Sequence, residues 1–216
     1  MKDIPRQRGR RYIASLVAEG EHEHQDFKFA ISDSRKIARS ISAFANAGGG
    51  RLLIGVKDNG VVAGVRNEED VFVVEQAAER YCSPAVEVEF TAFSYDTNIT
   101  VIRASIPQAP VRPVKCQEPD GKWRAYYRVA DENIVAHPLM VRSWMSEGLS
   151  FSLTEEVAKL FDLLDGRPDG VDVSEISRWL CMSQRCAEAL VVNLASAGIV
   201  TFVYRAPSFR IARAIQ

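Results

Sequence analysis

The sequence predicts an α+β fold in two domains, a mixed-sheet domain over residues 1–148 and a smaller domain over residues 149–216. Two observations carry this prediction. Amphipathic helical stretches alternate with short strand-like segments over residues 11–145, which is typical of a mixed α+β domain. After the polar segment 147–150 the pattern changes to three helices and a terminal hairpin, so we expect the domain boundary there.

Periodicity and breaker residues give the order of elements in the first domain. Apolar residues three and four positions apart predict helices, and alternating or β-branched apolar runs predict strands. Gly48, Gly49 and Gly50 end the second helix, because glycine accepts the left-handed conformation that closes helices. We expect helices over residues 11–19, 34–47, 67–82 and 137–145, and strands over 51–58, 61–65, 86–96, 98–107 and within 113–136, with 51–58 and 61–65 paired as a hairpin around the turn 58–60.

The second domain follows a different plan. A capping box from Ser152 to Glu155 begins its first helix, Asp172 caps the second, and Ser183 begins the third. A hairpin over residues 199–212 follows. The side chains expected to point inward on the second and third helices are Ile176, Trp179, Leu180, Cys186, Leu190 and Leu194. Three helices and a hairpin in this order are the plan of a winged helix-turn-helix.

Composition and charge indicate a globular protein that is neither a membrane protein nor a secreted one. The chain has 216 residues, of which 47% are hydrophobic and 25% charged, with a formal net charge of −1, as in ordinary globular proteins. Apolar runs stay short of the roughly 18 residues that a membrane helix needs, and the basic N-terminus lacks the apolar core of a secretory signal. Because the four cysteines show no paired spacing, we expect reduced thiols in a cytoplasmic protein without a zinc site.

Several motifs resemble a known family. Residues 21–28 read EHEHQDFK, and residues 43–64 read AFANAGGGRLLIGVKDNGVVAG. An acidic-Phe-Lys triplet, a helix ending in Ala-Phe-Ala-Asn, a glycine run and a Leu-Ile-Gly-Val strand in this order are similar to the Schlafen AlbA-like domain, to which DNA binding is ascribed. The similarity runs over most of residues 15–140. Bacterial members often carry a C-terminal helix-turn-helix domain and are described as transcriptional regulators, an arrangement that this chain fits.

The resemblance also implies a candidate metal site. In some Schlafen relatives, acidic residues that match Glu21, Asp26 and Asp58 bind a divalent metal ion for RNA cleavage, and three carboxylates suit Mg²⁺ or Mn²⁺. The family usually has Glu at the position of Asp26. An unbroken strand would place Glu21 and Asp26 on opposite faces, so their convergence requires a bend near residues 22–24. Asp58 has an alternative role as the opening residue of a turn.

Other cofactors are not expected. Some members of the family are called ATP-binding, but GGGRLLIG lacks the lysine of a phosphate-binding loop. The glycine run follows a helix C-terminus, whereas phosphates prefer helix N-termini. We therefore interpret it as a tight turn, with backbone contacts to a phosphate as the alternative.

Candidate nucleic-acid contacts are polar and basic side chains on exposed helix and hairpin positions. Side chains near the start of the third helix of a winged helix can reach base edges, and a hairpin can contact the backbone. The expected contacts are Lys28, Arg35, Arg39, Gln184, Arg185, Arg205 and Arg210. Residues 151–216 hold seven basic and eight acidic residues. Binding therefore requires that the charges be sorted in space into a positive face.

The sequence favours a nucleic-acid-binding protein, specifically a bacterial transcriptional regulator that binds DNA in preference to RNA. Two alternatives stay open. One is a divalent-metal-dependent endoribonuclease that uses Glu21, Asp26 and Asp58. The other is a dimerisation or protein-docking module, in which the second domain forms a homodimer.

Overall fold

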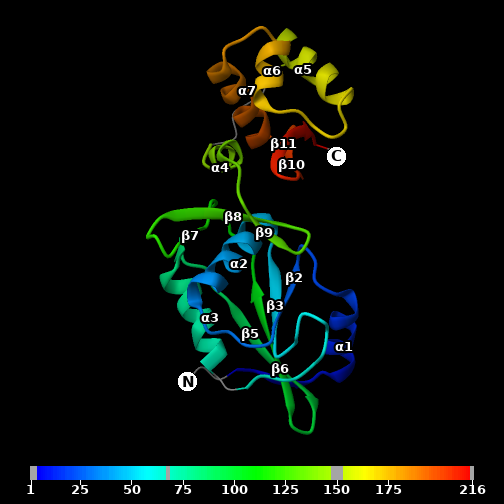
Figure 1. Ribbon diagram of the computed structural model, residues 1–216, viewed down its shortest axis with the longest axis vertical. Helices are drawn as coiled ribbons and strands as arrows, with labels where there is room; N and C mark the ends of the chain where they lie inside the picture. Colours follow the sequence, from blue (N-terminus) through cyan, green and yellow to red (C-terminus); the bar gives the residue numbers. More distant parts are fainter. Residues whose placement is uncertain (1–3, 67–68, 147–152, 215–216) are drawn as a thin grey trace. The chain divides into compact units, whose positions relative to one another are not determined.

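The computed structural model describes residues 4–66, 69–146 and 153–214. The chain divides into two compact units, Met1–Ala136 and His137–Gln216. This division precedes the predicted boundary at residue 148, because helix α4 (Pro138–Trp144) contacts α7 (Gln184–Ser196) and contributes Leu139 to the core of the second unit (Figure 1). The expected boundary segment 147–150 and the expected cap Ser152 lie outside the described residues.

A mixed five-stranded sheet forms the base of the first unit. Its strand order is β1-β5-β6-β3-β2, in which the outer pairs β1–β5 and β2–β3 are parallel and the inner pairs are antiparallel. A second sheet has the order β4-β7-β8-β9. The strands are β1 (Arg6–Arg8), β2 (Gln25–Lys28), β3 (Gly50–Ile54), β4 (Cys82–Ser83), β5 (Glu89–Asp96), β6 (Ile99–Ile106), β7 (Lys115–Gln117), β8 (Trp123–Val129) and β9 (Glu132–Val135).

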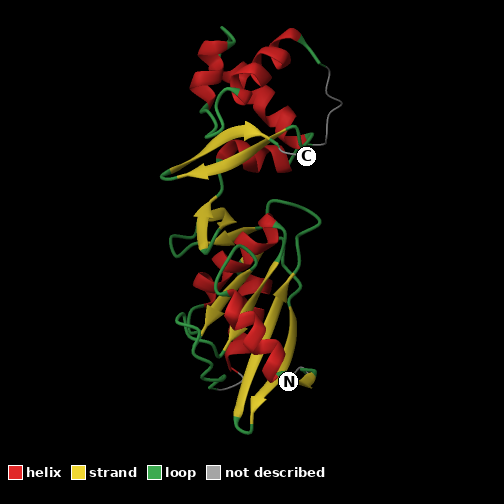
Figure 2. Cartoon of the chain, turned by 90° about the vertical axis from the view of Figure 1, so that its right-hand side faces the viewer, coloured by secondary structure: helices red, strands yellow, loops and turns green. Residues whose placement is uncertain are grey.

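Helices cover both faces of the five-stranded sheet (Figure 2). Helix α1 (Arg10–Glu19) packs Ile13 and Leu16 against Phe27 and Phe93 on one face. Helices α2 (Ser34–Ala47) and α3 (Glu69–Arg80) share a larger core with the opposite face. Helix α2 also packs against β7 and β8, so it lies between the two sheets with most of its surface buried (Figure 1). This explains why its sequence is apolar or small on nearly every side after the first turn.

The predicted hairpin of residues 51–58 and 61–65 is confirmed only at its tip. There Val56 bridges Val62, the N–H of Lys57 donates to the carbonyl oxygen of Val61 at 3.0 Å, and the N–H of Ala63 donates to that of Gly55 at 2.9 Å. Strand β3 itself pairs with β2 and β6 instead. A central strand has both edges occupied, so it has no free edge for a partner that follows it closely. Gly55 ends the strand at a φ of +99°, where an added Cβ would lie 2.6 Å from the backbone of Gly64.

The glycine run after α2 is a tight turn, as interpreted from the sequence. The N–H of Gly49 donates to the carbonyl oxygen of Phe44 at 2.8 Å. Its φ is +86°, and a Cβ there would meet the carbonyl oxygen of Ile106 at 2.9 Å. These three glycines thus let β3 start directly beside the end of α2.

Three helices and a hairpin follow α4 in the second unit. They are α5 (Glu155–Asp165), α6 (Val173–Trp179), α7 (Gln184–Ser196), β10 (Val200–Arg205) and β11 (Ser208–Arg213). The predicted cap at Asp172 and the predicted start of the third helix at Ser183 are confirmed, since Ser183 caps α7. Helix α5 begins at Glu155 with Thr154 as its cap. Among the helices of the described residues, none is long and apolar enough to cross a membrane.

Two side chains of the second unit point outward against expectation. Trp179 is 57% exposed at the end of α6, and Cys186 is exposed in the first turn of α7. The predicted Leu194 is buried, and the predicted Leu180 and Leu190 are partly buried against the core. Ala187, Val191 and Val192 are buried as well, because α7 packs against α4 as well as α6 and so buries a wider stripe than predicted.

The side-chain amide of Asn46 joins α2 to the second sheet. Its Nδ2 donates to the carbonyl oxygens of Val114 at 2.9 Å and Tyr126 at 2.8 Å, and its Oδ1 accepts from the N–H of Val114 at 2.9 Å. Asn46 is completely buried. Because water does not reach these groups, the amide is the partner that satisfies them.

We expect Asn46→Ala to lower the free energy of unfolding by about 2–4 kcal/mol, since the N–H of Val114 and the carbonyl of Tyr126 lose this buried partner. Urea unfolding of the full chain measures the change. The exposed Asn98 of the β5–β6 turn provides a matched control, and Asn98→Ala should stay within about 0.5 kcal/mol of the parent protein. Equal losses for the two variants would contradict the proposed role of the amide.

Candidate nucleic-acid interface

A polar cleft of about 490 Å³ lies between α2, the end of β2 and the β8–β9 hairpin. Four cationic side chains from three elements line it: Lys28 of β2, Lys36 and Arg39 of α2, and Arg128 of β8. Lys36 and Arg39 stand three residues apart on α2 and so share one face of the helix. The remaining lining residues are Asp26, Ser40, Tyr126, Asp131, Glu132, Asn133 and Ile134.

A buried ion pair between Asp26 and Arg128 forms the floor of the cleft. A guanidinium nitrogen of Arg128 lies 3.3 Å from Oδ1 of Asp26, and Nζ of Lys28 lies 2.7 Å from Oδ2. The side chains of Asp26 and Arg128 are 7% and 1% exposed. Arg128 also donates to Oδ1 of Asn133 at 2.9 Å and stacks over the ring of Phe44. The carboxylate is thus neutralised by two cations.

A second ion pair holds Arg39. Its guanidinium makes a two-pronged contact with the carboxylate of Glu118, which is buried and also accepts from the hydroxyl of Tyr126 at 2.7 Å. The hydrogen bonds from Arg39 hold the pKa of Glu118 below its usual value, although burial acts in the opposite direction. Burial and the bond to Glu118 raise the pKa of Tyr126 to about 12. At neutral pH the carboxylate is therefore ionised and the phenol protonated.

The chain bends before β2 as the candidate metal site requires. His22 and Gln25 exchange backbone hydrogen bonds of 3.0 and 3.1 Å, so the strand begins only at Gln25. This turn brings Glu21 back to β2, where its Oε1 accepts from the N–H of Phe27 at 2.8 Å. Burial raises the pKa of Glu21, the bond from Phe27 opposes this, and the neighbouring Asp26 raises the pKa further.

The three predicted carboxylates do not fit a shared Mg²⁺ or Mn²⁺ site as they stand. Both oxygens of Asp26 already face cations, and Asp58 is exposed in the turn after β3. Within residues 4–66, 69–146 and 153–214, no group of three or more His, Cys, Asp or Glu side chains could hold a metal ion. Metal binding by Glu21, Asp26 and Asp58 therefore stays a prediction that requires other side-chain positions.

The predicted contacts of the second unit lie on its surface. Gln184 and Arg185 are exposed in the first turn of α7. Arg205 pairs with Asp169 at 3.3 Å, and Arg210 lies 3.6 Å from Glu175 and donates to the carbonyl oxygen of Gly170 at 3.1 Å. The hairpin cations therefore face carboxylates in the free protein.

The burial of their acidic partners determines which predicted cations can exchange that partner for a phosphate. The side chains of Arg205 and Asp169 are 50% and 85% exposed, and such a surface pair contributes about 0–1 kcal/mol, so a phosphate can displace Asp169. Removing Arg39 from Glu118 would instead leave a buried carboxylate without its cation, at a cost of several kcal/mol. Arg35 is exposed and lies over the ring of Tyr81 at 4.9 Å. Arg35, Arg185, Arg205 and Arg210 are thus the available predicted cations, whereas Lys28 and Arg39 are held by buried carboxylates.

Lys36 and Arg128 line the cleft but are not among the contacts expected from the sequence. Lys36 stands beside the predicted Arg35, but only the position of β9 against α2 shows which of the two faces the cleft. Arg128 has a sequence signal, since it alternates with Tyr126 on the inner face of β8. A cation on a buried strand face needs a carboxylate partner, which could have directed attention to Asp26.

Comparison with known proteins identifies the family. A family model described as Schlafen, AlbA_2 matches residues 21–137, more than half of the chain. The chain belongs to the Schlafen AlbA_2 family. The match spans every residue that lines the cleft. No curated protein sequence matches the chain.

Two solved structures have weaker similarity to this Schlafen AlbA_2 chain. The DIP2311 protein from Corynebacterium diphtheriae is 15% identical with a TM-score of 0.46, over 92% of this chain and 37% of that one. This chain thus spans little more than a third of that protein. The N-terminal domain of a protein from Nitrosomonas europaea, described as related to the ATP-dependent DNA helicase RecG, is 19% identical with a TM-score of 0.42, over 69% of this chain and 96% of that one.

We expect Arg128→Met to lower the free energy of unfolding by about 3–5 kcal/mol, because Asp26 stays buried with one of its two cations removed. The double change Asp26→Leu with Arg128→Met should cost less than the sum of the single changes. Urea unfolding of the four proteins gives the coupling energy. Arg124→Met, at an exposed position of the same strand, is the control and should change little. Additive losses would show that the pair does not act as a unit.

Proposed function

We propose that the protein binds nucleic acid and acts as a bacterial transcriptional regulator with a preference for DNA over RNA. The observation that carries this proposal is the cleft in which Lys28, Lys36, Arg39 and Arg128 converge from three elements. Converging cations on a fixed frame attract a phosphate backbone. Membership of the Schlafen AlbA_2 family agrees with this role.

The cations of the cleft have two different roles in this proposal. Arg128 and Arg39 are tied to Asp26 and Glu118, so they stabilise the frame and add positive potential without leaving their partners. Lys36 is exposed at the rim, and Lys28 is partly exposed. Lys36 is therefore the group that meets a phosphate directly, and Lys28 adds positive potential from its place beside Asp26.

In this proposal the second unit recognises the base sequence of the DNA. Its three helices and hairpin follow the order of a winged helix, with α7 in the place of the recognition helix. Gln184 and Arg185 in the first turn of α7 can donate to base edges in the major groove. Arg205 and Arg210 on the hairpin would contact the backbone after exchanging their carboxylate partners for phosphates.

We expect the full chain to bind duplex DNA with an affinity that falls steeply between about 50 and 200 mM salt, because binding to phosphates releases counterions. Replacing Lys36 and Arg185 by Ala should weaken binding and lower the salt slope by about one for each cation that no longer meets a phosphate. Fluorescence anisotropy with labelled duplex DNA, and with RNA of the same sequence, measures both quantities.

Arg80→Ala is the matched control for that titration. Arg80 is an exposed arginine at the end of α3, away from the residues that line the cleft, so its removal should leave the salt slope unchanged. Absent binding to DNA and RNA at low salt would reject the proposal. Equal affinity for RNA would reject the preference for DNA and keep the binding.

A metal-dependent endoribonuclease is the weaker proposal, since the carboxylates do not fit a shared metal site as they stand. We expect structured RNA incubated with Mn²⁺ to be cleaved no faster by the parent protein than by Asp58→Ala. Asp58 is exposed, so this change should not unfold the chain, and Asp120→Ala in another exposed turn is the control. Metal-dependent cleavage that Asp58→Ala alone removes would establish the nuclease.

A dimerisation or protein-docking role for the second unit remains the third proposal. The exposed Trp179 and Met145 are apolar groups that such an interface would use. Light scattering of the full chain distinguishes it, because a homodimer has twice the mass of the chain, whereas a monomer that binds DNA supports the regulator.

A further inference from the structure

The first unit has an apolar hollow away from the nucleic-acid cleft. About 360 Å³ in volume, it lies between the segment after β4 and the proline-rich segment after β6. Its apolar lining is Pro84, Ala85, Val86, Pro107, Ala109, Pro110, Val111 and Val114. Val111 at its rim is 68% exposed, the largest exposed fraction among the large hydrophobic residues described in this unit. This volume is at the low end for ligand pockets, and the lining suits an apolar group.

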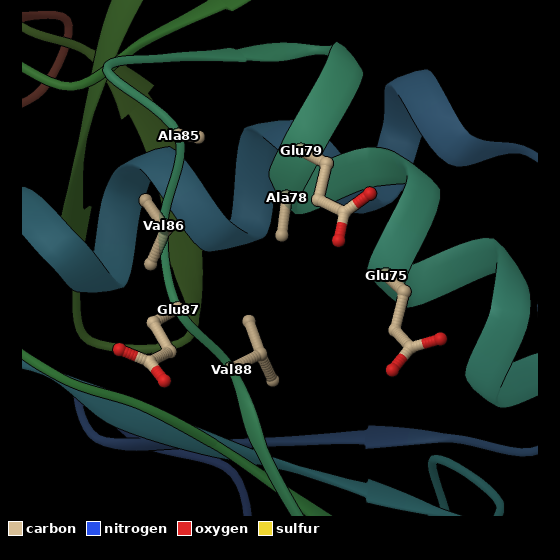
Figure 3. A pocket seen from close by; sticks show the side chains of 7 residues that line it. All are labelled: Glu75, Ala78, Glu79, Ala85, Val86, Glu87 and Val88. Atoms are coloured by element: carbon tan, nitrogen blue, oxygen red, sulfur yellow. The ribbon is translucent and has the colours of Figure 1, made fainter. Parts of the chain in front are cut away.

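An acidic hollow adjoins the apolar one. It has a volume of about 350 Å³ and lies between α3 and residues 85–88, where Glu75, Glu79 and Glu87 surround the apolar Ala78 and Val88 (Figure 3). The two hollows share Ala85, Val86 and Glu87, so the segment between them is a common wall. The N–H of Val86 donates to the carbonyl oxygen of Ala78, which ties this wall to α3.

The charge beside the acidic hollow opposes a polyanion, and Arg112, the basic residue of the proline-rich segment, donates to the carbonyl oxygen of Asn46 at 3.2 Å. From residue 69 to residue 89 the chain carries six acidic residues and a single basic one, Arg80. Phe72 is 64% exposed one helical turn before Glu75, so a second apolar group flanks the carboxylates. The described residues contain no group of three acidic, His or Cys side chains with the geometry of a metal site. The surface therefore fits a ligand that is apolar and cationic together.

We propose that these two hollows bind an extended peptide segment of a partner protein, in which an apolar side chain stands two positions from Lys or Arg. The apolar side chain enters the hollow beside Val111, and the cation lies among Glu79 and Glu87. Residues two positions apart in an extended chain are about 7 Å from each other, which lets a short segment cross the common wall. Charge complementarity with Glu79 and Glu87 selects the basic residue and rejects an acidic one.

Binding of short labelled peptides to the full chain tests this proposal. The probe is a fluorescein-labelled Gly-Ser peptide that carries Leu and, two positions later, Arg, and the matched probe has Glu in place of Arg. We expect anisotropy to show saturable binding of the Arg peptide and at least about tenfold weaker binding of the Glu peptide. The double variant Glu79→Lys with Glu87→Lys should reverse this preference, because both side chains are exposed and their replacement leaves the core intact.

Two further variants complete the test. Val111→Ser should weaken binding of the Arg peptide by removing the apolar contact, and Asp120→Lys, at an exposed position of the β7–β8 turn, should leave it unchanged. Circular dichroism checks that each variant is folded. No saturable binding, equal binding of the two peptides, or an unchanged preference in the Glu79→Lys, Glu87→Lys variant would overturn the proposal. Self-association through this surface, seen as a dimer that Val111→Ser dissolves, would also overturn it in favour of a second copy.

Discussion

The buried ion pair of Asp26 and Arg128 is the interaction on which the first unit depends. Asp26 belongs to the five-stranded sheet and Arg128 to the four-stranded sheet, so their contact joins the two sheets beside α2. Charges this far from water persist only when they are paired, because an unpaired buried charge destabilises the fold by several kcal/mol. The pair therefore fixes how β2 and β8 approach one another, and Lys28 takes its position from the same carboxylate.

The cleft follows from this constraint. With Asp26 neutralised by Arg128 and Lys28, the buried carboxylate that lines the cleft does not repel a phosphate. The cations that remain partly exposed can meet one, whereas Asp131 and Glu132 at the β8–β9 turn limit where it can lie. The same pairing opposes a metal site, since the oxygens that would bind the ion already face Lys28 and Arg128. One ion pair thus favours phosphate binding and disfavours metal binding at the same place.

The net charge of the chain is close to zero, but its acidic and basic side chains gather on different surfaces. The hollows beside α3 are acidic and apolar, whereas the cleft between α2 and β8 gathers four cations. In the second unit the charges are more finely mixed, and Arg205, Arg210 and Arg213 each face a carboxylate. Exposed pairs of this kind exchange partners at little cost, so they do not prevent contact with phosphate.

The sequence by itself determined the class of fold, most helices, strands β5 and β6, the β10–β11 hairpin, the cap at Asp172 and the start of α7 at Ser183, because periodicity, turn residues and capping are local. It also pointed to the family through Asn46 and the glycine run. Only the tertiary structure decided the partners of β3, the unit to which α4 belongs, and the ion pair of Asp26 with Arg128. These are contacts between distant segments, and no local pattern encodes which strand edge or which charge will be adjacent.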